Sequence, residues 1–267
     1  MAGLTAEYTP FETGLVDART PLLPADEIRR IRGQVTCHGV AIYQDAVVFR
    51  IPADQQQRFA ELLANPPVRE GDAVVALYYD FNTPFGYTST VIADRIEREY
   101  RARFDWRGFE LFPDWRPLLQ VDIGIVRERW KRNRLIPLKY DLPVADRRPM
   151  YRRTRNAMAA LEFAKLMGQQ RPLRDALFRA AWVDDRDIED PSILKDIAIE
   201  VGVDGLAVEA AVVSKQFDAL LDQYRQMAIE AGVFGAPSFV IGRQLVWARD
   251  PYELIVEALE REGVAKR

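Results

Sequence analysis

The chain has 267 residues, of which 48% are hydrophobic and 29% are charged, and its formal net charge is −3. This composition is typical of a globular protein with one large domain or two small ones, and it favours neither nucleic acid nor a membrane surface as a partner. With a single cysteine, Cys37, and a single histidine, His38, the sequence excludes a Cys/His zinc site, an iron–sulfur cluster and an internal disulfide, so we expect no metal.

The first part of the chain is predicted to be an extension with little regular structure. Prolines punctuate residues 1–34, residues 39–51 predict two short strands around a tight turn, and residues 53–63 predict a short amphipathic helix. The N-terminus lacks the basic flank and apolar run of a secretory signal, and no apolar segment reaches the ~18 residues of a membrane span. We therefore expect a cytoplasmic protein.

A strand, a helix and a second strand are predicted next. The apolar run over residues 72–79 is typical of a strand buried on both faces. Pro84 suits the first position of a helix with Thr83 as its N-cap, and the helix is expected to continue to about residue 103. Residues 104–111 predict the second strand, so this order implies a parallel pair.

Helical periodicity dominates the following part of the chain. Its clearest apolar stripe consists of Phe217, Leu220, Leu221, Tyr224 and Ala228. Residues 235–242 and 244–247 then predict two short strands, and Asp250 with Pro251 predicts the cap and first turn of a last helix. The resulting order is β-α-β, a large helical insertion, and β-β-α.

This order and four segments resemble the DsbA-like branch of the thioredoxin superfamily, and most of all the group of kappa-class glutathione transferases, 2-hydroxychromene-2-carboxylate isomerases and FrnE-type proteins. The segments are residues 79–87, 109–114, 177–178 with 187–191, and 232–239. The resemblance implies an α/β, thioredoxin-like fold with a large inserted helical domain, plus an N-terminal extension. The implied boundaries are 1–70 for the extension, 71–113 and 233–267 for the thioredoxin-like domain, and 114–232 for the inserted domain.

The resemblance also places a candidate catalytic residue. Redox members of the superfamily carry Cys-Pro-x-Cys where this chain has Thr83, Pro84, Phe85 and Gly86. A dithiol couple needs a thiolate, so disulfide oxidoreduction by this chain is excluded. Glutathione-using relatives have a serine at the Thr83 position and receive the thiol on glutathione. The resemblance therefore implies glutathione as cofactor, with Thr83 donating to its thiolate and the first-turn N–H groups lowering the thiol pKa.

Three further residues of the glutathione site are implied by the resemblance. Ala236 and Pro237 stand where the superfamily has a cis-proline, and the residue before that proline offers its backbone groups to a peptide or to glutathione. Asp250 retains the carboxylate that meets the γ-glutamyl amino group in glutathione-binding relatives.

Other residues are expected to contact the substrate. Asn82 is expected to orient a substrate oxygen, and Phe85 and Tyr87 are expected to line an apolar pocket. Residues 127–155 contain eleven basic and three acidic residues. Within and just after that basic stretch, Arg155 and Asn156 are the expected binders of a carboxylate.

Each of these residues also has a structural interpretation. Thr83 and Asp250 are good helix caps, and Asn82 can satisfy the backbone of its turn. Aromatic side chains after a buried strand often belong to the core, and a basic stretch is often a solvated helix face.

We therefore expect an enzyme, a glutathione-dependent isomerase or transferase that acts on a small aromatic or unsaturated acid. A bound thiolate would add to an electrophilic carbon, the former double bond would rotate, and elimination would regenerate the thiol. Two alternatives stay open: a catalytically inactive DsbA-like binding protein, and a pathway enzyme that uses the same cleft without glutathione. The expected partner is a small-molecule substrate, with no nucleic acid and no membrane, and residues 1–70 offer a surface for a homodimer.

Overall fold

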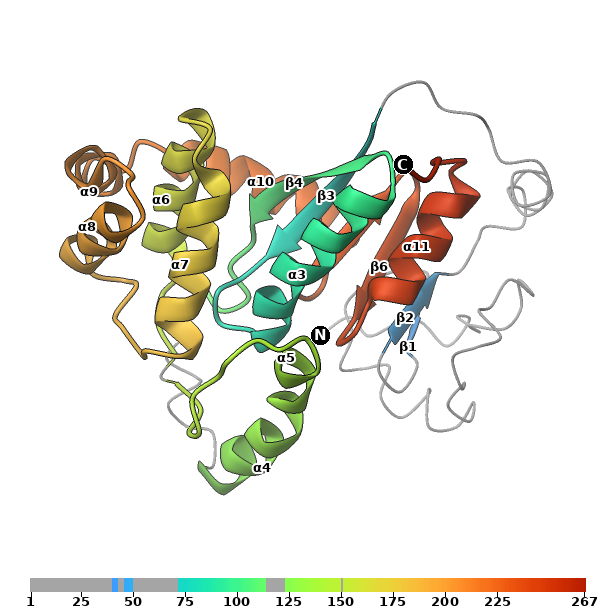
Figure 1. The fold of residues 1–267 in the computed structure, drawn as a ribbon, viewed down its shortest axis with the longest axis horizontal. Helices are drawn as coiled ribbons and strands as arrows, with labels where there is room; N and C mark the ends of the chain where they lie inside the picture. The colour runs from blue at the N-terminus through green and yellow to red at the C-terminus, as the bar shows by residue number, and fades with distance from the viewer. Residues whose placement is uncertain (1–39, 43–45, 50–71, 114–122, 150) are drawn as a thin grey trace. The chain divides into compact units, whose positions relative to one another are not determined.

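The structure is a computed structural model that describes residues 40–42, 46–49, 72–113, 123–149 and 151–267 (Figure 1). The chain divides into two compact units. The first contains the chain up to Tyr78, residues 93–106 and the chain from Ala228 onward, and the second contains residues 79–92 and 107–227. Cys37, His38 and the helix predicted over residues 53–63 lie outside the described residues, and the domain boundaries given above stay predictions.

The first unit is built on a mixed sheet with the strand order β1-β2-β6-β5-β3-β4. Its strands are β1 (Val40–Ile42), β2 (Ala46–Phe49), β3 (Ala73–Tyr79), β4 (Ala102–Gly108), β5 (Ser238–Ile241) and β6 (Gln244–Ala248). The first two strands pair antiparallel, with Val40 opposite Phe49, and β5 pairs with β6 in the same way, with Ile241 opposite Gln244. Both predicted hairpins are therefore confirmed, and β2 also pairs with β6.

The strands β3 and β4 run parallel, as predicted from the strand–helix–strand order. The Ala73 N–H donates to the Arg101 carbonyl before β4, and the Phe109 N–H donates to the Tyr79 carbonyl at the end of β3. The expected burial of β3 on both faces is confirmed along the strand except at Val74, whose exposed fraction is 44%.

The helix between these strands, α3 (Pro84–Glu99), is shorter than predicted. The Tyr100 N–H closes its last turn on the Ile96 carbonyl, and Tyr100 then forms an isolated antiparallel bridge with Lys266. Because this bridge draws the chain into extended backbone, β4 begins at Ala102, before the predicted residue 104.

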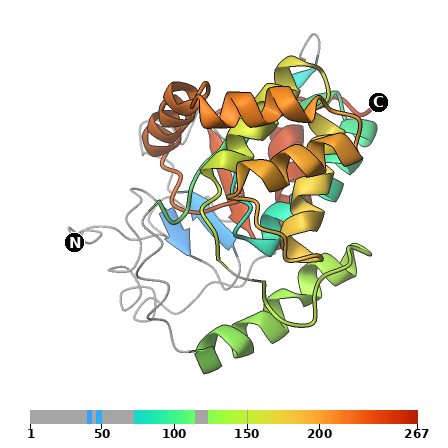
Figure 2. The same ribbon diagram turned by 90° about the vertical axis from the view of Figure 1, so that its left-hand side faces the viewer.

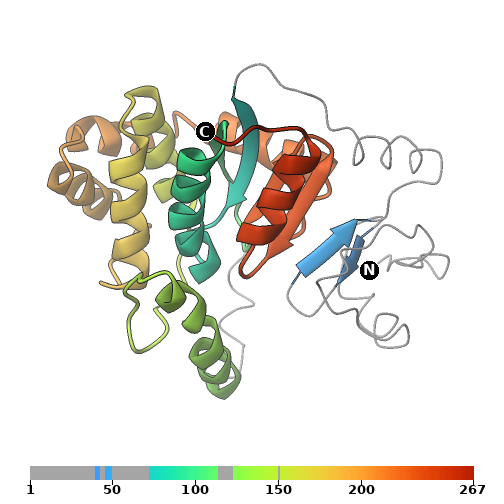
Figure 3. The same ribbon diagram turned by 45° about the vertical axis from the view of Figure 1, so that its right-hand side comes forward.

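The last helix, α11 (Tyr252–Arg261), packs on β5 and β6 within the first unit (Figure 3). Its apolar face buries Ile255 and Leu259 completely. The predicted cap was wrong: Pro251 is the N-cap residue, and no side chain caps the helix. The helix starts after Pro251, one residue later than expected, which leaves Asp250 outside the capping position.

Helices account for the second unit. They are the first part of α3, α4 (Ile123–Asn133), α5 (Leu135–Lys139), α6 (Arg155–Leu166), α7 (Gln170–Trp182), α8 (Pro191–Glu200), α9 (Gly205–Val213) and most of α10 (Asp218–Glu230). The helices α6 to α9 pack on one another, and Figure 2 shows α8 and α9 in the foreground. The predicted stripe is confirmed in part: Leu221 and Ala228 of α10 and Phe217 just before it are buried, whereas Leu220 and Tyr224 are half-buried. Between β4 and β5 the described residues form no strand.

None of the described helices is long and apolar enough to cross a membrane.

Candidate functional site

The turn between β3 and α3 is organised around one buried carboxylate, that of Asp80. Its exposed fraction is 0%. Oδ1 accepts hydrogen bonds from the Asn82 N–H (2.9 Å) and the Thr154 hydroxyl (2.8 Å), and Oδ2 accepts one from the Leu111 N–H (2.7 Å). The carboxylate thus joins the turn, the chain after β4 and the chain before α6. Desolvation by burial raises the pKa of Asp80 from 3.8 to about 6, although these hydrogen bonds oppose the shift.

Thr83 occupies the N-terminal end of α3, where the predicted cap forms. Its Oγ1 accepts a hydrogen bond from the Phe85 N–H (3.3 Å), and its carbonyl accepts one from the Gly86 N–H (3.1 Å). The side chain is buried, with an exposed fraction of 6%. Among the described residues, its hydroxyl proton has no acceptor. The hydroxyl is therefore a poised donor, whereas two of the first-turn N–H groups are already bonded.

Aromatic side chains fill the space behind this turn. Phe178 is fully buried and lies with its ring centroid 4.6 Å from Phe81 and 5.9 Å from Tyr87, which it stacks on. A Cβ added at Gly86 would lie 2.7 Å from the Asp80 carbonyl oxygen and 3.2 Å from Phe178, so only glycine suits this position. Tyr87 is thus a packing residue of the second unit, while Phe85 is half-buried.

Asn82 binds the backbone of the segment before α6 through both polar atoms of its side-chain amide. Its Nδ2 donates to the Arg152 carbonyl (2.7 Å), and its Oδ1 accepts from the Arg152 N–H (3.3 Å). The side chain therefore holds the segment before α6 against the turn, as its structural interpretation predicts.

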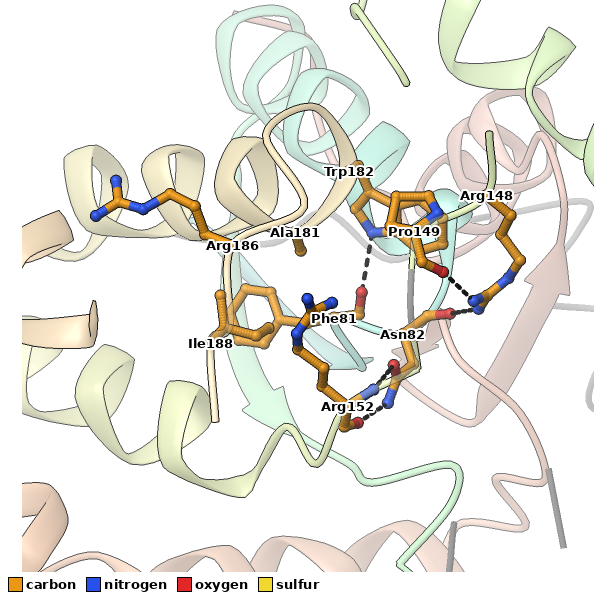
Figure 4. A pocket seen from close by; sticks show the side chains of 9 residues that line it. All are labelled: Phe81, Asn82, Arg148, Pro149, Arg152, Ala181, Trp182, Arg186 and Ile188. Carbon is orange, nitrogen blue, oxygen red and sulfur yellow. Dashed lines mark hydrogen bonds between the residues drawn. The ribbon is translucent and has the colours of Figure 1, made fainter. Parts of the chain in front are cut away.

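A pocket lies beside this turn, within the second unit (Figure 4). It is lined by Phe81, Asn82, Arg148, Pro149, Arg152, Ala181, Trp182, Arg186 and Ile188. The buried Trp182 indole donates to the Phe81 carbonyl (2.9 Å) and fixes one wall against the turn. The pocket is therefore lined by two buried aromatic residues and three arginines.

Two of these guanidinium groups have carboxylate partners. Arg152 Nη1 lies 2.7 Å from Asp185 Oδ1, and Arg152 Nε lies 3.3 Å from Asp187 Oδ1. Arg186 lies 2.8 Å from Glu200, and in Figure 4 it points away from the other two arginines. Arg148 differs from both, because it forms no ion pair with any described residue.

The sequence-predicted carboxylate binders do not line this pocket. Arg155 is surrounded by three carboxylates, with distances of 3.2 Å to Glu110, 3.2 Å to Asp218 and 2.7 Å to Asp222. Asn156 donates through Nδ2 to the Glu189 carbonyl (2.6 Å). In this structure Arg155 and Asn156 thus connect helices, and their proposed contact with substrate stays a prediction.

The remaining predicted residues belong to the first unit. The Ala236–Pro237 peptide bond is cis, and Ala236 is buried. Asp250 is half-buried and lies two residues before α11. No cluster of three or more potential metal ligands occurs in the part of the chain that the structure describes.

Sequence reasoning missed Asp80 and Arg148. The signal for Asp80 was a lone acid directly after an apolar strand, a position that is expensive for a charge unless it is hydrogen-bonded. Arg148 belongs to the basic stretch already identified, but its sequence neighbours do not distinguish it from the paired arginines.

The chain has relatives of known name and fold. A model of the DSBA-like thioredoxin domain matches residues 74–260. The 2-hydroxychromene-2-carboxylate isomerase of Pseudomonas sp. (strain C18) is 23% identical over 202 residues, which are 70% of this chain and 90% of that protein.

Two solved structures have a similar fold. A probable DsbA oxidoreductase from Streptomyces coelicolor has a TM-score of 0.64 at 20% identity, over 71% of this chain and 89% of that one. A 2-hydroxychromene-2-carboxylate isomerase has a TM-score of 0.60 at 20% identity, over 70% of this chain and 95% of that one. Given the match of the family model to most of its length, the chain belongs to the DsbA-like thioredoxin family.

Proposed function

We propose that this protein is an isomerase that acts on a small aromatic or unsaturated acid and takes its thiol from glutathione. The relatives named 2-hydroxychromene-2-carboxylate isomerase support the reaction class. The observation that carries the proposal is the Thr83 hydroxyl at the start of α3, since it accepts a backbone N–H and keeps its own proton for an acceptor such as sulfur.

The turn offers a thiolate one hydroxyl donor, but two of its backbone N–H groups are already hydrogen-bonded. Thr83 offers a hydroxyl donor at the positive end of a helix, and both favour a negative charge. The Phe85 and Gly86 N–H groups are bonded to Thr83 itself, so the hydroxyl has to supply the local hydrogen bond. Glutathione, when bound, supplies a nucleophilic thiol that adds to an unsaturated carbon and leaves again.

The chain's own residues then have two tasks. Thr83 stabilises the charged form of the thiol, which lowers the thiol pKa towards neutrality. The pocket beside the turn holds the acid and excludes water from it, and such positioning supplies part of the rate.

Substitutions at Thr83 separate catalysis from helix capping. Thr83→Ser keeps both the cap and the donor, so we expect activity close to that of the wild type. Thr83→Asp keeps a good cap but places a second negative charge beside the thiolate, so we expect kcat/KM to fall by about 100-fold or more. The assay follows the absorbance of an unsaturated hydroxyaryl acid with millimolar glutathione, and thermal unfolding checks that both variants fold.

Calorimetry tests the role of glutathione directly. The proposal expects a binding heat when millimolar glutathione is titrated into the full chain, and the absence of binding would contradict it. A second candidate, an isomerase that uses the pocket without glutathione, is favoured by the occupied first-turn N–H groups. Isomerisation at an equal rate without any thiol would support that candidate instead.

A further inference from the structure

We propose that Arg148 binds the carboxylate of a small organic acid, and that the pocket lined by Trp182, Phe81 and Asn82 is the subsite that receives this carboxylate group. The identification of the acid as the substrate rests on the proposed function, whereas the binding of a carboxylate does not.

The positive charge of Arg148 has no anionic partner among the described residues. Its guanidinium is half-buried, and burial lowers the pKa of Arg148, yet an arginine stays charged at neutral pH. Its protein acceptors are two neutral carbonyl oxygens, those of Pro149 (2.5 Å) and Asn82 (3.4 Å). The nearby Asp185 is already hydrogen-bonded to Arg152. A partly desolvated cation without a paired anion is costly, and a bound anion would offset that cost.

Aromatic rings surround the guanidinium group of Arg148. Its central carbon lies 3.3 Å from the ring centroid of Tyr151 and 5.5 Å from that of Trp182. Trp182 in turn stacks on Trp130, with ring centroids 5.5 Å apart. The guanidinium thus lies against aromatic rings, and its planar fork is suited to bidentate binding of a carboxylate.

The residues around the pocket select the kind of anion that can bind there. Trp182 and Phe81 are 2% and 1% exposed, so the pocket receives the carboxylate group itself rather than the ring of the acid. The carboxylates of Asp185 and Asp187 around Arg152 disfavour a dianion such as phosphate. A monocarboxylate therefore suits the pocket better than a phosphate ester or a free phosphate.

The position of Arg148 connects this subsite to the turn. Its Nη2 donates to the carbonyl oxygen of Asn82, the residue that precedes Thr83. Arg148 is therefore bound to the residue next to Thr83, whose hydroxyl is proposed to act on the thiol.

Direct binding measurements on the full chain test this assignment. The probes are trans-cinnamate, which has the carboxylate, and cinnamamide, which has the same shape without the charge. We expect the wild type to bind cinnamate at least about tenfold more tightly than cinnamamide, because charge-assisted hydrogen bonds to a carboxylate contribute that much. In Arg148→Gln this preference should disappear through weaker cinnamate binding, with the affinity for cinnamamide unchanged.

The matched control is Arg153→Gln, which removes the same charge from the same segment. Arg153 does not line the pocket, is 57% exposed and lies 3.8 Å from Glu189, so its loss should leave the preference intact. If Arg148→Gln does not fold by circular dichroism, Arg148→Lys serves in its place, because it keeps the charge and loses the planar fork. A cinnamate affinity in the Arg148 variant equal to that of the wild type would overturn the assignment.

Further outcomes separate this assignment from the proposed function. Glutathione also carries carboxylates, so a loss of glutathione binding in Arg148→Gln with cinnamate binding retained would assign the cation to glutathione and overturn our proposal. Arg148-dependent cinnamate binding in a chain without isomerase activity would support the subsite and contradict only the proposed function.

Discussion

Two arginines of one basic stretch, Arg148 and Arg155, have opposite chemical surroundings. Arg155 lies among three carboxylates, and Arg148 lies against two aromatic rings and two carbonyl oxygens. The sequence predicts that this stretch is strongly basic, but not which guanidinium meets a carboxylate, because the acids around Arg155 come from the chain after β4 and from α10. An arginine of this stretch can bind a ligand carboxylate only where no acidic side chain from a distant part of the chain already pairs with it.

Asp80 is the second residue whose role depends on distant partners. Its hydrogen-bond donors are 2, 31 and 74 residues away in the chain. Only the nearest of them, the N–H of Asn82, follows from local turn chemistry. The anchoring of the turn was therefore beyond sequence analysis, although the turn itself was predicted.

Ionisation of Asp80 predicts a pH dependence of stability. Its pKa is about 6 in the folded chain and near 3.8 in the unfolded chain, so the folded state binds the proton more tightly. Stability from this group is present at low pH and is lost as pH rises through about 6. Between pH 4.5 and 7 the loss amounts to about 2 kcal/mol.

Urea unfolding of the wild type and of Asp80→Asn at pH 4.5 and pH 7 measures this effect. The variant has no titration at this position, so the wild type should gain about 2 kcal/mol relative to it at the lower pH. An equal difference between the two proteins at both pH values would show that Asp80 keeps its ordinary pKa.

At the scale of elements, the strands and the helices α3, α10 and α11 could be predicted from the chain, whereas α4 to α9 were expected only as one helical stretch. The apolar run of β3, the parallel β3–β4 pair, the two hairpins and the α10 stripe follow from short-range periodicity. The errors lie at ends of elements: α3 stops at Glu99 and α11 lacks the Asp250 cap. Ends depend on tertiary contacts such as the Tyr100–Lys266 bridge, which no local pattern contains.

Arg155 should behave as a connector of elements. It is the first residue of α6 and binds Asp218 and Asp222 of α10 as well as Glu110 after β4. Because Arg155→Ala leaves three carboxylates without this partner, we expect the unfolding free energy to fall by about 1–2 kcal/mol, less at high salt. Denaturant unfolding at two salt concentrations measures it.

The control for this experiment is Arg153→Ala, whose exposed pair should contribute no more than about 0.5 kcal/mol. Cinnamate affinity should be unchanged in both variants. Weakened cinnamate binding in Arg155→Ala would restore the original prediction that Arg155 contacts the acid.

At the scale of the whole molecule, the pocket and the sheet belong to different compact units. All residues that line the pocket belong to the second unit, whereas the sheet and the cis-proline belong to the first. The strands β1 and β2 extend that sheet beyond β6, since Ala46 and Val47 of β2 pair with Ala248 and Trp247 of β6.

Removal of residues 1–71 should therefore affect association rather than acid binding. Without β2, the backbone groups of β6 on the side away from β5 lose their partners, and an unpaired edge strand promotes self-association. We expect the shortened chain to form larger species in light scattering while its cinnamate affinity stays that of the full chain. A monomeric shortened chain that no longer binds cinnamate would contradict both expectations.

The hydrogen bond from Thr154 to Asp80 also constrains recombination between homologues. A crossover placed anywhere between the turn and Thr154 would combine the carboxylate of one parent with the side chain that the other parent has at position 154. Chimeras should thus tolerate junctions inside α8 or α9 far better than junctions within residues 83–153, unless both parents carry the same acid and hydroxyl.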